Sequence, residues 1–91
     1  MTKTQKQKEI IKRFLTFVEE VFPTYELDDY GDGGRITFFP INGTSDDIIE
    51  FQRSRLDLCV LNWASDQAKA DCLEMEDMLE IIIKEVKEQE A

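Results

Sequence analysis

The chain has 91 residues, 42% of them hydrophobic, and a formal net charge of −9, because 20 Asp and Glu outnumber 11 Lys and Arg. These values predict a single small acidic domain over residues 1–91 and exclude a disordered chain. No apolar run has the length of a membrane span or the pattern of a signal peptide, so we expect a cytoplasmic protein.

Apolar residues over 5–22 recur at spacings of three and four, which predicts an amphipathic helix. Thr2 or Thr4 can cap its start. Pro23 ends it, because the residue before a proline is pushed out of the α region. Residues 1–13 hold five basic residues and one acid, and such cations oppose the helix dipole. We favour a frayed, solvated end over a functional role for them.

The next segment predicts a β-hairpin. Alternation over Tyr25–Tyr30 indicates a short strand, residues 31–34 are a glycine-rich turn, and Arg35–Ile41 is a second strand. Pro40 removes a ladder donor, so this strand lies at a sheet edge there or ends. The adjacent pair Phe38–Phe39 predicts apolar neighbours on both faces of the strand.

Two further elements precede the last helix. Residues 46–53 are ambiguous, because Thr44 followed by Asp47 resembles a helix-capping box, whereas the preceding Asn-Gly turn favours a hairpin. We slightly favour a strand. Residues 56–61, rich in apolar side chains, predict a clearer strand.

Residues 64–89 predict the longest helix, started by Ser65 or Asp66. Six apolar residues recur along it with the spacing of a heptad seam. They are Ala68, Cys72, Met75, Leu79, Ile82 and Val86. We favour a face that packs on the sheet over a coiled-coil dimer contact. The predicted fold class is α+β: an antiparallel sheet of three to four strands, ordered α-β-β-(β)-β-α, with two helices covering one face.

The residue types exclude several chemistries. The chain has no histidine, which removes the commonest general base and every His-containing triad or zinc site. The glycine-rich turn at 31–34 lacks the ending of a phosphate-binding loop. We therefore predict no catalytic residue and no cofactor, and we expect a protein that is not an enzyme.

Two other features of the sequence have simpler interpretations than a functional site. Asp28, Asp29 and Asp32 suggest a calcium loop, but in that register Tyr30 and Phe39 occupy ligand positions, so we predict no metal site. Cys59 and Cys72 both fall at apolar positions and are predicted to be buried free thiols, with a disulfide as the less favoured alternative.

The last helix carries a predicted interaction surface on the side opposite the apolar stripe. Residues placed at 100° intervals gather there. The acidic members are Asp66, Glu74, Asp77 and Glu80, and two apolar residues, Leu73 and Ile81, lie among them. An apolar anchor ringed by charge is typical of a partner-binding surface, although single exposed apolar residues are also ordinary.

Further carboxylates lie near the two predicted turns. They are Asp28, Asp29, Asp32, Asp46, Asp47 and Glu50. If both turns lie at one end of the sheet, these residues form a second acidic patch. Carboxylates spaced along a surface can stand in for phosphates in a basic groove, because such a groove responds to charge and position.

Residues 14–91 hold six basic and nineteen acidic residues, and this field repels nucleic acid and anionic membranes while attracting basic surfaces. We therefore expect a non-catalytic module that binds a protein with a basic surface, mimics nucleic-acid charge and blocks a nucleic-acid-binding protein. In length, acidity and lack of catalytic residues the chain is similar to small phage-encoded inhibitors of host defence, such as anti-restriction and anti-CRISPR proteins. The likeness is one of composition.

Three alternatives stay open. The first is a self-associating structural or regulatory protein, a possible homodimer with the heptad seam or the Leu73/Ile81 face as its contact, since small domains are marginal alone. The second is an antitoxin or immunity-type partner of one toxin, bound through the last helix. The third, ranked last, is an enzyme that uses carboxylates and a divalent metal.

Overall fold

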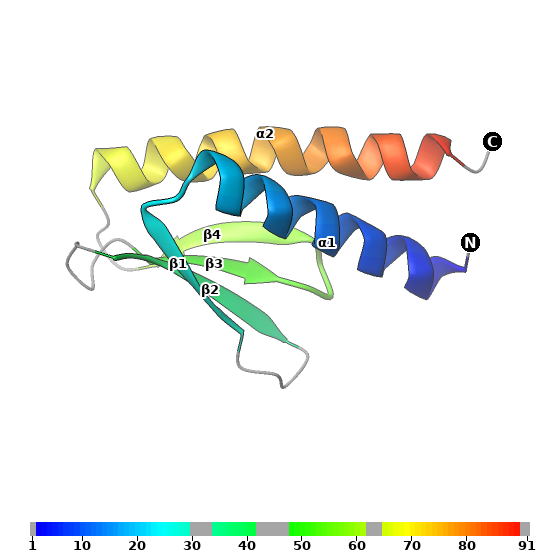
Figure 1. The fold of residues 1–91 in the computed structure, drawn as a ribbon, viewed down its shortest axis with the longest axis horizontal. Coiled ribbons are helices and arrows are strands. Elements are labelled where there is room, and N and C mark those ends of the chain that lie inside the picture. The colour runs from blue at the N-terminus through cyan, green and yellow to red at the C-terminus, as the bar shows by residue number, and fades with distance from the viewer. Residues whose placement is uncertain (1, 30–33, 42–47, 62–64, 90–91) are drawn as a thin grey trace.

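A computed structural model describes residues 2–29, 34–41, 48–61 and 65–89, and within them it confirms the predicted α+β fold. The elements are α1 (Lys3–Val21), β1 (Tyr25–Asp29), β2 (Arg35–Pro40), β3 (Ile48–Gln52), β4 (Asp57–Leu61) and α2 (Asp66–Glu88). The strands form one antiparallel sheet in chain order. Both helices lie on the same side of it and run in opposite directions (Figure 1).

Helix α1 begins two residues earlier than predicted, because Thr2 closes its first turn. The Thr2 hydroxyl accepts a hydrogen bond from the Gln5 backbone N–H at 3.2 Å, and the Gln5 side chain accepts one from the Thr2 N–H at 2.8 Å. This reciprocal capping box satisfies two of the helix's free donors. The basic first turns are therefore helical and not frayed, which corrects that part of the prediction, while most of their side chains are exposed to solvent, as favoured. Phe22 caps the other end, directly before Pro23.

The ambiguous segment 46–53 contains strand β3, as favoured, and β4 follows at the predicted place. Pro40 pairs with Tyr25 at the last position of β2. Because β2 lies between β1 and β3, the proline is tolerated at the end of a central strand and not at a sheet edge.

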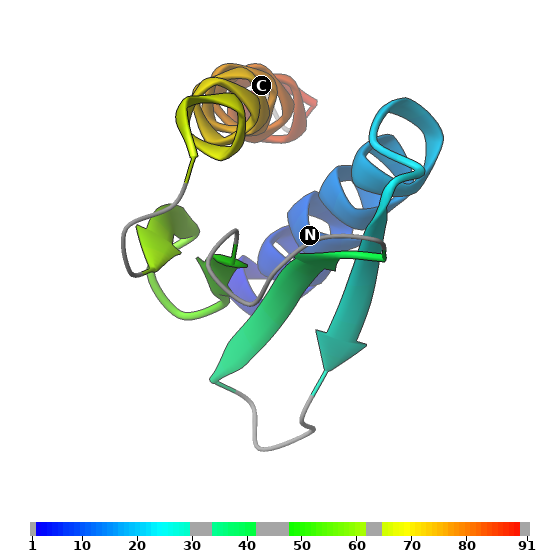
Figure 2. The same ribbon diagram turned by 90° about the vertical axis from the view of Figure 1, so that its left-hand side faces the viewer.

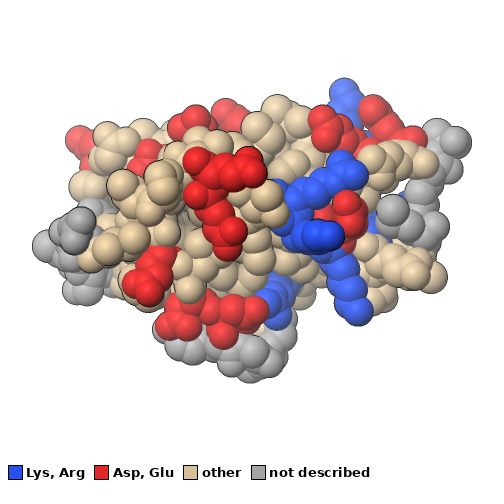
Figure 3. Space-filling view, in the orientation of Figure 1, with Lys and Arg blue, Asp and Glu red and all other residues tan. Residues whose placement is uncertain are grey.

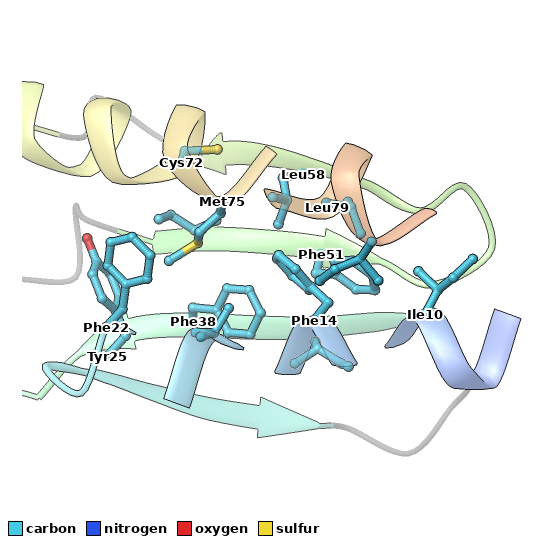
Figure 4. Close-up of a cluster of buried hydrophobic side chains, with 14 of the residues drawn as sticks. Ile10, Phe14, Phe22, Tyr25, Phe38, Phe51, Leu58, Cys72, Met75 and Leu79 are labelled. Carbon is cyan, nitrogen blue, oxygen red and sulfur yellow. The ribbon is translucent and has the colours of Figure 1, made fainter. Parts of the chain in front are cut away.

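The core lies between the inner face of the sheet and the two helices. Phe14 of α1 is fully buried, stacks on Phe51 of β3 with ring centroids 4.9 Å apart, and lies 6.1 Å from the ring of Phe38. Figure 4 shows these rings meeting beneath Met75 and Leu79 of α2. Large aromatic surfaces of this kind dominate the stability of a small core.

Helix α2 lies over β3 and β4, with α1 beside it (Figure 2). All six residues of its heptad stripe are buried in the core of this one chain. The stripe is thus the face that packs on the sheet, as favoured. The alternative, a heptad dimer contact, is wrong, because those side chains are already covered.

Neither described helix covers the outer face of the sheet. Phe38 points into the core with no exposed surface, and its neighbour Phe39 is half-buried on the other side. Strand alternation also corrects the prediction for Cys59, which is exposed because Leu58 and Val60 occupy the inward positions of β4. Cys72 is buried, as predicted, and both thiols are free.

Candidate protein-binding surface

The outer face of α2 is the surface that the sequence predicted. The Ser65 hydroxyl accepts a hydrogen bond from the Ala68 N–H at 3.2 Å and so starts the helix. Over its 23 residues the buried stripe faces the sheet, which leaves the opposite side in solvent. We call that side the α2 outer face. Its members are Asp66, Leu73, Glu74, Asp77, Glu80 and Ile81, and all six are exposed.

The apolar pair on this face is unusual in its exposure. Leu73 is 62% exposed and Ile81 is 49% exposed, although both are large aliphatic side chains. They lie eight residues apart, which places them about 12 Å apart along the helix axis. Since full burial of such a side chain contributes about 1.5–3 kcal/mol, covering the exposed part of each would contribute about 1–2 kcal/mol. The pair therefore supplies two anchor points on one helix side.

The carboxylates around the pair are available to a partner. Asp66, Glu74, Asp77 and Glu80 form no ion pair with any residue in the described part of the chain. The last three are spaced by about 4.5 Å along the helix axis, the same order as the 3.4 Å per phosphate of one DNA strand. This row of charges is the feature that a phosphate-binding groove could recognise.

The second predicted patch is not a single surface. Residues Asp32, Asp46 and Asp47 lie outside the described part of the chain. The register pairs Asp29 with Ile36 and Tyr25 with Pro40, so β1 and β2 end at opposite ends of the sheet. The condition for one patch, that both turns share an end, is therefore not met.

The three described members of that set have separate surroundings. Asp28 is half-buried on β1, and the exposed Asp29 is paired with the guanidinium group of Arg53. Glu50 is only 8% exposed. Its carboxylate lies 3.6 Å from the Arg35 guanidinium and accepts a hydrogen bond from the Gln52 amide at 2.8 Å. Glu50 thus belongs to the structure of β3 and is not offered to a partner.

A basic groove beside α1 was not predicted as a site. It has a volume of about 600 Å³ and is lined on α1 by Lys8, Ile11, Lys12 and Leu15. Residues 53–54, in the turn between β3 and β4, complete it. Figure 3 shows Lys and Arg gathered on the same side of the molecule as α1, with some acidic side chains among them, such as Glu9, which pairs with Arg13. The uneven charge of the sequence was the signal, but only the fold brings the β3–β4 turn to the helix.

Among residues 2–29, 34–41, 48–61 and 65–89 no group of three or more His, Cys, Asp or Glu could hold a metal ion. In the same ranges neither helix is long and apolar enough to cross a membrane. The chain matches no protein-family model, no curated protein and no solved structure. The fold and its surfaces thus define a small α+β protein with an acidic helix face centred on two apolar residues.

The two thiols should differ strongly in reactivity. Burial, with the nearby Glu76 carboxylate, raises the pKa of Cys72 to about 12, and partial burial with Glu50 and Asp57 raises the pKa of Cys59. At a pH below the pKa of a thiol, each unit by which that pKa is raised lowers the thiolate fraction about tenfold. With an aromatic disulfide reagent at about pH 8, we expect Cys59 to react in the folded protein and Cys72 only after unfolding.

The matched control is Cys59→Ser, which should remove the accessible thiol and leave Cys72 protected until urea is added. Equal rates for both thiols in the folded wild type would contradict the placement of Cys72 on the sheet-facing side of α2 and of Cys59 on the open sheet face.

Proposed function

We propose that this chain is a non-catalytic, acidic protein-binding module whose α2 outer face contacts a basic surface on a partner protein. The observation that carries the proposal is the exposure of Leu73 and Ile81 among four carboxylates that have no described ion-pair partner. An apolar centre with a charged rim matches the anatomy of protein interfaces. The charges steer the encounter and set the register, and the two aliphatic residues contribute affinity.

The proposed partner is a cytoplasmic nucleic-acid-binding protein, and binding would block its phosphate-binding groove. Two features support this choice: the net charge of −9, which disfavours direct binding to nucleic acid, and the regular spacing of carboxylates along α2. Inhibition of a host defence protein, of the anti-restriction or anti-CRISPR kind, is one use of such a surface. An antitoxin or immunity-type complex would use the same face.

The test is capture of proteins from a nuclease-treated bacterial lysate by the tagged chain, followed by elution with a salt gradient. The face variant carries Asp66→Asn, Glu74→Gln, Asp77→Asn and Glu80→Gln. The control variant carries Glu19→Gln, Glu20→Gln, Glu26→Gln and Asp57→Asn, four exposed acids elsewhere. Both variants undergo the same change in net charge.

We expect the wild type and the control variant to retain a nucleic-acid-binding protein that moderate salt releases, and the face variant to lose at least about 90% of it. The purified partner should then bind DNA or RNA less tightly when the wild-type chain is added. Equal retention by the face variant would overturn the proposal. One salt-resistant partner without nucleic-acid function would replace it with the antitoxin or immunity-type alternative.

A further inference from the structure

The basic groove beside α1 (Lys8, Ile11, Lys12, Leu15 and residues 53–54) combines an apolar floor with a cationic rim. Ile11 and Leu15 are partly buried and pack at the margin of the core, so they present apolar surface without being enclosed. Lys8 and Lys12 are exposed and form no ion pair with a described residue. Two free ammonium groups therefore flank the floor.

Arg53 is held firmly at the end of this groove. Its backbone carbonyl accepts a hydrogen bond from the Gln7 side chain at 2.6 Å, which ties the β3–β4 turn to α1. Its guanidinium group pairs with Asp29, and its Nε is buried with no hydrogen-bond partner among the described residues. The exposed ammonium groups of Lys8 and Lys12 are therefore the cations of the groove that an anionic side chain can reach.

The α2 outer face has the complementary composition. The groove offers two aliphatic side chains with cations on its rim, and the outer face offers Leu73 and Ile81 with carboxylates around them. The groove volume of about 600 Å³ has room for more than one aliphatic side chain. Complementary charge around an apolar contact fixes the register of an interface and disfavours wrong partners.

The two surfaces lie on different parts of the molecule. The α2 outer face points away from the sheet, because the opposite side of the helix is buried against it. The groove is formed by α1 and the β3–β4 turn, and no residue of α2 is among the residues that line it. A contact that joins two different surfaces is heterologous, so it produces a chain of molecules or a ring.

We infer that the basic groove beside α1 binds the α2 outer face of a second copy of this chain, so that the protein associates head to tail. The inference rests on the proposed function, since both use the α2 outer face. It adds that a second copy of the chain occupies that face when the basic target is absent. Target and second copy then compete, and dissociation of the assembly releases the active inhibitor.

The net charge of −9 on each copy opposes this contact at long range. At about 0.1 M salt the Debye length is about 10 Å, so the overall repulsion is largely screened while groups in direct contact still attract. We therefore expect association to be strongest near that salt concentration. It should weaken at about 1 M salt, where the Debye length falls to about 3 Å.

Sedimentation velocity and equilibrium in about 0.1 M NaCl test the inference over about 10 µM to about 1 mM, the range of weak contacts. The groove variant is Lys8→Glu with Lys12→Glu, and the anchor variant is Leu73→Asp with Ile81→Asp. All four positions are exposed, and circular dichroism would check that both variants fold as the wild type does. The charge control is Arg55→Glu with Lys69→Glu, two exposed residues that do not line the groove.

The wild type and the charge control should rise in average mass above 10.6 kDa with concentration, and each of the other variants alone should stay at that mass. An equimolar mixture of the groove and anchor variants should form a complex of about 21 kDa, twice 10.6 kDa, and no larger species. In that mixture the Lys8/Lys12 variant keeps its outer face and the Leu73/Ile81 variant keeps its groove. Each pair can therefore form one contact and cannot bind a third molecule.

Two results would overturn the inference. A wild type that stays at 10.6 kDa throughout does not self-associate. A groove variant that dimerises alone uses a symmetric contact in which the groove has no part. Lysate capture distinguishes this failure from failure of the proposed function. If the wild type is a monomer but the variant with the four neutralised carboxylates of the α2 outer face loses capture of the partner, the proposed function stands and only self-association is overturned.

Discussion

Replacement of Phe14 by alanine is expected to lower the free energy of unfolding by about 3–5 kcal/mol. Phe14 has no exposed surface, and its ring is shared between Phe51 at 4.9 Å and Phe38 at 6.1 Å. It is therefore a side chain of α1 that packs on both central strands, β2 and β3. Truncation removes the apolar contact and leaves a cavity that surrounding rings can fill only in part, because aromatic side chains relax little.

The measurement is urea unfolding followed by circular dichroism, with Phe39→Ala as the matched control. Phe39 is the same residue type one position from Phe38, but it is half-buried on the open face of the sheet. We expect its loss to cost about 1 kcal/mol, near the average for single substitutions. Since domains of this kind unfold with about 5–15 kcal/mol, Phe14→Ala should leave a protein close to the limit of folding. Similar costs for both variants would contradict the assigned sheet faces.

The helices could be predicted because their evidence is local. In α2, six apolar residues repeat at helical spacing over 23 residues, and the exposed set lies opposite by geometry alone. The exposure of Leu73 and Ile81 was therefore available from the sequence. The strand at 46–53 was harder, since its capping-box and hairpin signals conflict, and the pairing of β3 between β2 and β4 decides it.

What could not be predicted depends on contacts between distant segments. Both thiols lie in apolar stretches, but whether Cys59 faces a helix or solvent depends on which side of the sheet the helices cover. The same holds for Glu50, whose burial follows from its neighbours Arg35 and Gln52 on the outer face. Arg53 completes the basic groove only because the β3–β4 turn reaches α1. The periodicity of the sequence does not show which distant segments come into contact.

The acidic turns illustrate a further limit. Carboxylates at 28–32 and 46–50 are close in sequence, and a shared surface was a reasonable expectation. In an antiparallel sheet ordered along the chain, however, consecutive connections leave from opposite ends, so β1 and β2 terminate far from each other. The α2 outer face therefore holds the predicted site residues that the described structure places together on one exposed surface.

The second large effect is expected from Leu79→Ala, which should lower the free energy of unfolding by about 2–5 kcal/mol. Leu79 lies on α2 two positions before Ile81, and it is 3% exposed where Ile81 is 49% exposed. Alanine favours helix at both positions, so the difference between the two variants reports packing and not helix propensity. For Ile81→Ala we expect a change within about 0.5 kcal/mol. Urea unfolding of both proteins under one set of conditions gives the comparison.

The same pair separates stability from binding. Ile81→Ala should keep the fold yet weaken both lysate capture and self-association, because it removes an anchor from the α2 outer face and nothing from the core. Leu79→Ala should weaken binding only as far as it unfolds the protein. If Ile81→Ala destabilised the isolated chain as much as Leu79→Ala, the outer face would already be covered within the folded molecule, and neither a basic target nor a second copy could use it.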